Sequence, residues 1–290
     1  MAIRKAVIPA AGLGTRVLPA SKSIPKEMLP IVDKPALQYI VEEAVASGIT
    51  DILIITGRGK GAMEDHFDKS PELERRLAAT GKESALKTLE QISSMANIHY
   101  LRQQEPRGLG HAVSLARSFV GAEPFAVLYG DDVIIGERPA CGQLCEAFEK
   151  HGRGVAGIKP VPAGQIHRYS SLKVEPMEGR CYTITDMIEK PEPGKEFSNY
   201  SILGRCVLPA SIFEILDETP PGSGGEIQLT DAMRTLALRD GMIGIEYEGT
   251  RYDMGNKLGY MMANIEVALH HPEIGTEFRE YLRALQATLF

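Results

Sequence analysis

Short apolar runs alternate with amphipathic stretches along the first half of the chain. The runs 5–9, 51–57 and 125–129 have the length and the continuous apolar character of buried strands. Residues 37–45 carry apolar side chains at helical spacing, which predicts a helix that buries one face. A further strand is predicted over 98–102. This alternation of strands and helices predicts an α/β fold with a mostly parallel sheet.

The second half of the chain is richer in strands. We expect these strands to extend the same sheet and to cover a substrate, without forming an independent domain. A helix is expected after Thr230, with this threonine as its cap. The candidate strands are 155–158, 171–174, 181–184 and 201–204.

Three helical regions complete the pattern. Residues 71–94 are charged and predict a pair of surface helices with a solvated face. Apolar residues at helical spacing predict one helix between 109 and 119, where we expect a structural role for His111. Two helices are predicted at 257–270 and 273–286, separated by Pro272. A stripe on these last helices is expected to pack in the core, although part of it could serve a subunit contact; its members are Leu258, Met261, Met262, Ile265 and Leu269.

Composition narrows the class of protein. The chain has 290 residues, of which 43% are hydrophobic, and a formal net charge of −6. This balance argues against broad nucleic-acid binding, which needs a basic face. The four cysteines lack the paired spacing of a zinc site and are expected to be reduced packing thiols, as in a cytoplasmic protein. Neither a signal peptide nor an apolar run of membrane-spanning length is recognisable, so no membrane partner is expected.

The first strand leads into a glycine turn followed by long cations. Gly12 and Gly14 allow positive φ and a close approach of the backbone to a ligand. Free N–H groups in such a turn suit phosphate oxygens, and Arg16 and Lys26 add positive charge. Val17 replaces the third glycine of a dinucleotide fingerprint, and the turn lacks a P-loop Gly-Lys-Ser/Thr. From spacing alone the turn either binds phosphate or is an ordinary strand-to-loop turn with solvated cations.

Two carboxylates end the strand over 125–129. Asp131 and Asp132 follow Gly130 directly. In open α/β sheets ligands bind beyond the carboxyl ends of the strands, and paired carboxylates there suit a hard cation. The alternative is a turn in which an aspartate caps the following loop.

Taken together, these motifs resemble the sugar-1-phosphate nucleotidyltransferases. The resemblance rests on 10–16 (Ala-Ala-Gly-Leu-Gly-Thr-Arg), Leu18-Pro19, Pro25-Lys26 and 28–30 (Met-Leu-Pro), and it extends over nearly the whole chain. It implies a Rossmann-like three-layer α/β/α fold with a mixed, mostly parallel central sheet and C-terminal helices. It also implies one domain, 1–290, made of a nucleotide-binding half (1–150), a sugar-phosphate-binding half (151–256) and helices at 257–290.

The activity that the resemblance implies is transfer of a nucleotidyl group from UTP to glucose 1-phosphate, giving UDP-glucose and pyrophosphate. The sugar phosphate is largely ionised near neutral pH because its second pKa is about 6, so direct in-line attack on the α-phosphorus needs no general base. Alignment and charge neutralisation are what the enzyme must supply, and Mg²⁺ is the implied cofactor. A homo-oligomer, either a dimer or a tetramer, is also expected.

Residue roles follow from the same resemblance. The catalytic cations are Arg16 and Lys26 on the triphosphate and Lys190 on the sugar phosphate. Asp131 and Asp253 correspond to the metal ligands. Asp132 is assigned to metal or ribose, and the role of Glu226 is left open. The remaining substrate contacts are Ala10, Ala11, Gly12, Gly14 and Thr15 in the first loop, Gln103 and Gly108 as the base-reading pair, and Ser170, Glu189 and Ile202 on the sugar side.

Two alternatives remain open on the sequence. A thymidylyltransferase would change only the base or sugar, whereas a non-catalytic paralogue would sense sugar nucleotides. The first loop favours the uridylyl branch, and the retained cations and carboxylates favour catalysis. One departure concerns the sugar: Ser170 stands where the family commonly has glycine after a tyrosine. If positive φ is needed there, serine costs about 1 kcal/mol.

Overall fold

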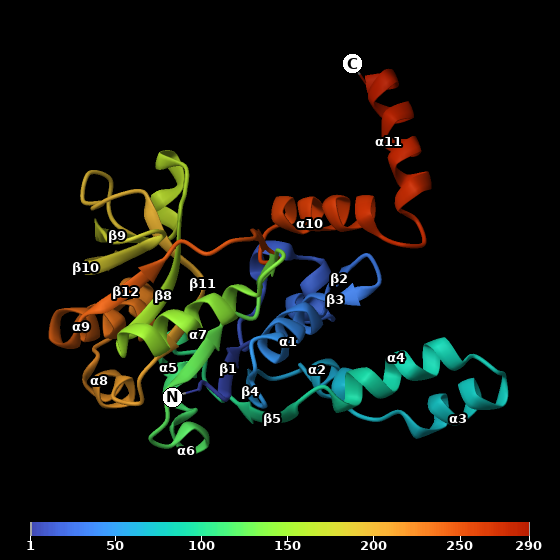
Figure 1. Cartoon of the computed structure of the whole chain (residues 1–290), viewed down its shortest axis with the longest axis horizontal. Helices are drawn as coiled ribbons and strands as arrows, with labels where there is room; N and C mark the ends of the chain where they lie inside the picture. The colour runs from blue at the N-terminus through green and yellow to red at the C-terminus, as the bar shows by residue number, and fades with distance from the viewer. Residues whose placement is uncertain (1, 290) are drawn as a thin grey trace.

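A nine-stranded mixed sheet runs through the molecule, with helices packed on both of its faces (Figure 1). The computed structural model describes residues 2–289. The strand order is β5-β4-β1-β6-β11-β8-β12-β10-β9. These strands are β1 (Lys5–Pro9), β4 (Asp51–Thr56), β5 (Asn97–Arg102), β6 (Phe125–Leu128), β8 (Gly154–Pro160), β9 (Ser170–Pro176), β10 (Cys181–Glu189), β11 (Tyr200–Leu208) and β12 (Met242–Ile245).

The N-terminal part of the sheet is parallel, from β5 through β4 and β1 to β6. Beyond β6 the pairing becomes mixed, because β11 joins antiparallel to both β6 and β8. The second half of the chain therefore extends the same sheet, as its strand pattern predicted. The α/β fold with a mixed central sheet is confirmed.

Helices cover both faces because the strand side chains alternate. Ile8 and Ile54 point into one core, and Val7 and Leu53 point into the other. The first core is covered by α1 (Ala36–Ala46), α7 (Ala140–His151) and α10 (Lys257–His270), and the second by α5 (Leu109–Ser114), α6 (Arg117–Val120), α8 (Ile212–Glu218) and α9 (Leu229–Asp240).

The remaining helices lie at the periphery. A short helix, α2 (Ala62–Phe67), precedes the pair α3 (Pro71–Ala79) and α4 (Glu83–Ser94), which projects from the β5 side of the sheet (Figure 1). The predicted surface hairpin over 71–94 is thus confirmed, and neither of its helices has a buried residue. The last helix, α11 (Gly275–Leu289), follows α10 and extends away from the sheet (Figure 1).

Two small antiparallel ribbons are separate from the main sheet. One joins β2 (Pro30–Ile31) to β3 (Lys34–Pro35) just after the first loop. The other pairs β7 (Asp132–Ile135) antiparallel with β13 (Thr250–Asp253), and its register sets Asp253 opposite Asp132. This second ribbon brings the late carboxylate to the end of β6.

Three sequence expectations are wrong. The single helix expected between 109 and 119 is two short helices, because 3₁₀-type bonds such as Ala116 N–H to Val113 O tighten the chain between them. Thr230 does not cap α9: Gln228 precedes the helix without a side-chain cap, and the Thr230 hydroxyl donates to Glu189 Oε2 at 2.8 Å.

The third error concerns the apolar stripe of α10. Leu258 is 70% exposed and Met261 is 51% exposed, and Met262 and Ile265 are also exposed. The helix packs instead through small residues such as Ala263 and Ala268. Most of the stripe therefore lies on the surface and not in the core.

All four cysteines are free thiols, three of them buried. Within residues 2–289, no helix has both the length and the apolar character to cross a bilayer.

Candidate active site

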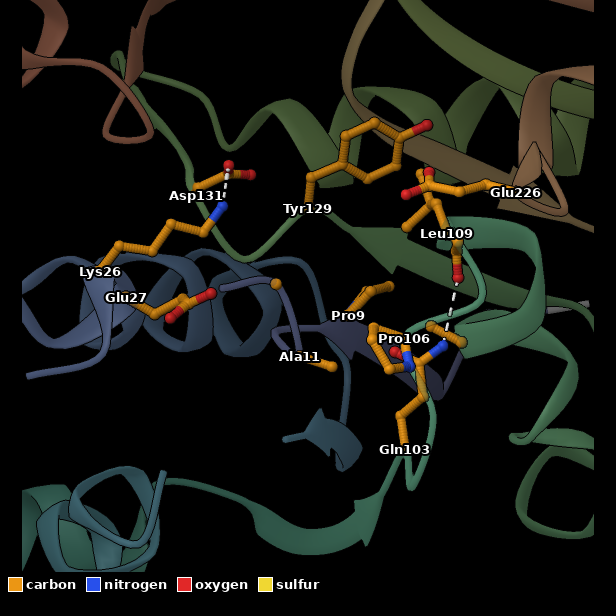
Figure 2. Close-up of a pocket in the computed structure, with 13 residues that line it drawn as sticks. Pro9, Ala11, Lys26, Glu27, Gln103, Pro106, Leu109, Tyr129, Asp131 and Glu226 are labelled. Atoms are coloured by element: carbon orange, nitrogen blue, oxygen red, sulfur yellow. Dashed lines mark hydrogen bonds and ion pairs between the residues drawn. The ribbon is translucent and has the colours of Figure 1, made fainter. Parts of the chain in front are cut away.

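A cavity opens at the carboxyl ends of β1 and β6, where the first loop meets the segment after β5 (Figure 2). We call it the nucleotide cavity. Gly130 lets the two strand ends approach, since a Cβ there would lie 2.8 Å from Pro9 O. Its walls comprise Pro9, Ala11, Gly12, Lys26, Glu27, Gln103, Pro106, Gly108, Leu109, Ala112, Tyr129, Asp131 and Glu226.

One end of this cavity is cationic. Lys26 donates to Asp131 Oδ2, and both side chains reach into the cavity (Figure 2). Burial lowers the pKa of Lys26, but Asp131 and Glu27 outweigh burial and raise it overall. Arg16 is exposed, with its guanidinium 4.0 Å from Asp131 and 3.8 Å from Asp253. Two cations therefore lie beside Asp131, and such side chains can make charge-assisted hydrogen bonds to phosphate oxygens.

The glycine turn lies against these cations. Gly14 has a φ of 67°, and a Cβ there would come within 3.1 Å of Ser21. A Cβ on Gly12 would lie 3.6 Å from Lys26 Nζ, so the turn lies directly beside the ammonium group. Thr15 starts a short 3₁₀ turn, Thr15–Val17, and is exposed.

A buried ion pair supports the start of the same loop. Lys60 Nζ lies 2.9 and 3.0 Å from the carboxylate oxygens of Glu27, and it also donates to Ala10 O. Glu27 is 1% exposed and Lys60 is 7% exposed. The Lys60 ammonium group thus anchors the loop backbone at Ala10, and the sequence analysis did not identify Lys60. No motif marked Lys60, which lies 50 residues further along the chain.

The other end of the nucleotide cavity is polar but not cationic. Gln103 is buried and donates from Nε2 to Gly108 O at 3.3 Å (Figure 2). Gly108 has a φ of 104°, and a Cβ there would clash at 2.7 Å with both Glu226 and Ile227 O. Only glycine fits between the two segments. Glu226, whose role the sequence left open, is exposed and lines the cavity beside this glycine.

A second cavity, the sugar cavity, adjoins the first. Asp131, Tyr129 and Leu109 line both. Its other walls come mainly from the second half of the chain: Arg16, Asp132, Arg168, Tyr169, Ser170, Glu189, Ile202, Gln228, Thr230, Arg251 and Asp253. The two halves of the site therefore meet at Asp131.

Glu189 is held inside the sugar cavity by Thr230. Burial raises the pKa of Glu189, and the hydrogen bond from Thr230 opposes this. Lys190 follows with a φ of 46°, unusual for a residue with a side chain, and its Nζ lies 3.8 Å from Glu189. Lys190 is exposed and does not line either cavity.

Ser170 and Ile202 contact each other across the sugar cavity. Ser170 Oγ accepts from Ile202 N–H at 3.1 Å and lies 3.1 Å from Ser201 Oγ. Ser170 begins β9 and is not among the described residues with positive φ. The structure thus removes the strain considered for serine at this position. It also shows that the Ile202 amide is already paired with Ser170, and that the Ile202 carbonyl accepts from Ser201 Oγ at 3.4 Å.

Asp132 is engaged in a buried ion pair. Arg251 Nη2 lies 2.5 Å from Asp132 Oδ1, and its guanidinium carbon is 5.5 Å from the centre of the Tyr169 ring. Burial raises the pKa of Asp132 to about 6 although Arg251 opposes this. Arg251 was missed from sequence, and the signal was its place two residues before Asp253. Asp132 acts here as the anchor of Arg251.

Asp131 and Asp253 fit a divalent cation. A Cβ on Gly255 would lie 2.7 Å from Arg16 Nη2, 2.8 Å from Asp253 Oδ1 and 2.9 Å from Asp131 Oδ2, so both carboxylates and the guanidinium converge on the space that this glycine leaves. Burial raises the pKa of Asp131, but Lys26, Arg251 and Arg16 outweigh it and lower the pKa overall. In residues 2–289, no cluster of three or more His, Cys, Asp or Glu could hold a metal. A pair of carboxylates is compatible with Mg²⁺, which takes few protein carboxylates and completes its shell with water and phosphate oxygens.

Comparison with known proteins decides the family. The family model described as "Nucleotidyl transferase" matches residues 5–268. The chain belongs to the nucleotidyl transferase family. A UTP–glucose-1-phosphate uridylyltransferase, YngB, of Bacillus subtilis (strain 168) is 51% identical over 280 residues, which cover 97% of this chain and 94% of that protein.

Solved nucleotidyl transferases share this fold as well. A UTP-bound UGPase from Acinetobacter baumannii matches with a TM-score of 0.89 and 40% identity, covering 97% of this chain and 98% of that one. A UDP-glucose pyrophosphorylase complexed with UDP-glucose matches with a TM-score of 0.83 and 43% identity, covering 90% of this chain and 97% of that one.

Proposed function

We propose that this chain makes UDP-glucose and pyrophosphate from UTP and glucose 1-phosphate. The observation that carries the proposal is a pair of adjoining cavities that share Asp131. The nucleotide cavity has a cationic end and a polar end, and the sugar cavity is lined by Glu189 and Arg251. Relatives about 50% identical over nearly their full length carry the name of this activity.

The reaction needs two anions to be brought together. An oxygen of the glucose 1-phosphate attacks the α-phosphorus of UTP, a new P–O bond forms, and the bond to pyrophosphate breaks. Because the attacking phosphate is already ionised, no proton has to be removed. Catalysis then consists of alignment and of positive charge on the phosphates.

On the nucleotide side, we assign the triphosphate to Arg16, Lys26 and the turn at Gly12–Gly14. The uracil is assigned to Gln103 and Gly108, at the polar end of the cavity. Lys26 is mostly buried and stays protonated because Asp131 raises its pKa. It therefore keeps its charge as pyrophosphate leaves.

On the sugar side, we assign the sugar hydroxyls to Glu189 and the sugar phosphate to Lys190. Arg251 lines the sugar cavity together with Arg16 and Arg168, and its charge is paired with Asp132. Ser170 and the carbonyl of Ile202 border the sugar. Glucose specificity is supported by the names of the relatives.

Magnesium is proposed as the cofactor, held by Asp131 and Asp253. When bound it neutralises phosphate charge and aligns the two substrates. The division into halves at 1–150 and 151–256, the cytoplasmic location and the homo-oligomer stay predictions. The exposed apolar stripe of α10 supports the oligomer, since a large apolar patch often marks an interface.

The proposal is tested by pyrophosphate release from the purified protein with Mg²⁺. UTP, dTTP, ATP and GTP are each combined with glucose 1-phosphate or galactose 1-phosphate. Release with UTP and glucose 1-phosphate in preference to every other pair is expected. Preference for another pair would refute the assigned specificity, and binding of nucleotides without release from any pair would favour the non-catalytic paralogue.

A further inference from the structure

We propose that His111 fixes the side-chain amide of Gln103 with its oxygen toward the nucleotide cavity, and that this positioning makes the site select uracil over cytosine. The inference rests on the proposed function only in taking Gln103 as the residue that meets the base. His111 does not itself line the cavity. It is thus a positioning residue and replaces the purely structural role expected from the sequence.

The orientation of the amide follows from two contacts. Gln103 Nε2 lies 3.3 Å from Gly108 O and 2.8 Å from His111 Nδ1. A backbone carbonyl can only accept, so the atom that faces Gly108 O must be the NH₂ group. The same NH₂ group faces His111, and therefore Nδ1 accepts and the ring proton resides on Nε2.

Reversing the amide would be costly. The Gln103 oxygen would then face the Gly108 carbonyl, which places an acceptor against an acceptor, and His111 would have to move its ring proton from Nε2 to Nδ1 to pair with it. Gln103 is 7% exposed, so water cannot freely relieve such a mismatch. Both N–H groups are thus occupied, and Oε1 is the hydrogen-bonding atom that remains for a ligand in the cavity.

The neutral state of His111 is favoured by its surroundings. Burial and the nearby Arg107 lower the pKa of His111, and Glu105 opposes them weakly. His111 is also held at the start of α5, where Ser114 Oγ donates to its carbonyl at 2.9 Å. An unprotonated Nδ1 facing the amide is therefore the stable arrangement near neutral pH.

A fixed acceptor distinguishes the two pyrimidines. Uracil carries a hydrogen on N3 and can donate to Gln103 Oε1. Cytosine has an unprotonated N3, so it would present a second acceptor to the same oxygen. A site built around one hydrogen-bonding group rejects an analogue that leaves this group unpaired. Without His111, one N–H loses its partner, and only the Gly108 carbonyl still holds the amide in this orientation, so the preference for uracil is weakened.

The test measures equilibrium binding of UTP and of CTP, so it does not depend on turnover. His111→Leu removes the acceptor, and His111→Asn retains an acceptor at the δ position. Ser114→Ala is the matched control, because it perturbs the same helix without touching the amide. We expect His111→Leu to reduce the preference for UTP over CTP by about tenfold, the scale of one hydrogen bond. His111→Asn should restore most of the preference, and Ser114→Ala should leave it unchanged.

Equal weakening of both nucleotides by His111→Leu would overturn the inference, as would a failure of His111→Asn to restore the preference. Should the leucine variant not fold, ¹⁵N NMR of the wild-type histidines decides: the Nε2–H tautomer is expected for His111, and an Nδ1–H tautomer would refute the model. Absence of UDP-glucose synthesis by the wild type would refute the proposed function, while the UTP-to-CTP binding ratio would still test His111.

Discussion

The buried pair beneath the first loop gives the sharpest prediction on stability. Lys60→Met keeps a long apolar side chain but removes the ammonium group that lies 2.9 Å from Glu27. Burial raises the pKa of Glu27 and lowers the pKa of Lys60, so each group needs the other in order to remain charged. Because Glu27 is 1% exposed, its charge would be left in a nearly dry site.

The expected loss can be worked from these contacts. Removing one member of a buried ion pair costs about 3–5 kcal/mol of folding free energy. Adding Glu27→Leu removes the uncompensated charge and should restore part of this loss. A deficit of about 1–3 kcal/mol should remain, because Ala10 O has still lost its donor.

Urea denaturation followed by circular dichroism measures these changes. Lys34→Met is a matched control: Lys34 lies 2.8 Å from Glu42, but both side chains are about one-third exposed, so the loss should stay below about 1 kcal/mol. In Lys60→Met the KM for UTP should rise, because the loop loses its anchor, while the KM for glucose 1-phosphate stays constant. A loss under about 1 kcal/mol, or a double variant as unstable as Lys60→Met, would refute this reasoning.

The other predictions concern the substrates and the metal. Arg16→Ala should raise the KM for UTP about tenfold or more, which corresponds to the free energy of a charge-assisted hydrogen bond. Lys190→Ala should raise the KM for glucose 1-phosphate by a similar factor. Steady-state kinetics with each substrate varied in turn measures both effects, and an equal effect of both variants on both substrates would contradict these assignments. The pKa of Glu189 is raised, so as the pH falls this carboxylate becomes protonated earlier than an exposed glutamate would. The KM for glucose 1-phosphate should rise as this proton is taken up. In Glu189→Gln, measured over the same pH series, the increase in KM that is due to Glu189 should be absent. Chelation with EDTA should abolish activity, Mg²⁺ should restore it, and Asp253→Asn should require a higher Mg²⁺ concentration; an unchanged Mg²⁺ requirement would exclude Asp253 as a ligand.

The sequence predicted the strands and most helices because their signals are local. Continuous apolar runs such as 51–57 favour buried strands in an α/β chain, and the structure has β4 there. The motif residues of the two halves also converge, since strand ends in one sheet meet at one edge. Asp131 and Asp253, 122 positions apart in the sequence, reach that edge through the β7–β13 ribbon.

The wrong and missed predictions have a common cause: the partner of a side chain can lie in a segment that is distant in the sequence. Thr230 has the chemistry of a cap, yet its hydroxyl finds the buried Glu189 in β10. The stripe on α10 has helical spacing, but spacing does not say which face meets the core. Lys60 carries no local motif, and the only sequence signal of Arg251 was its place two residues before Asp253. The structure identifies their partners, Glu27 and Asp132.

The central claim is that a single direct displacement occurs where the two cavities meet at Asp131. The most direct test is the stereochemistry at the α-phosphorus, followed with UTP that carries a chiral phosphorothioate at that position. One in-line attack by glucose 1-phosphate predicts inversion of configuration in the UDP-glucose analogue. Retention would mean two displacements through a covalent intermediate, and it would contradict the account.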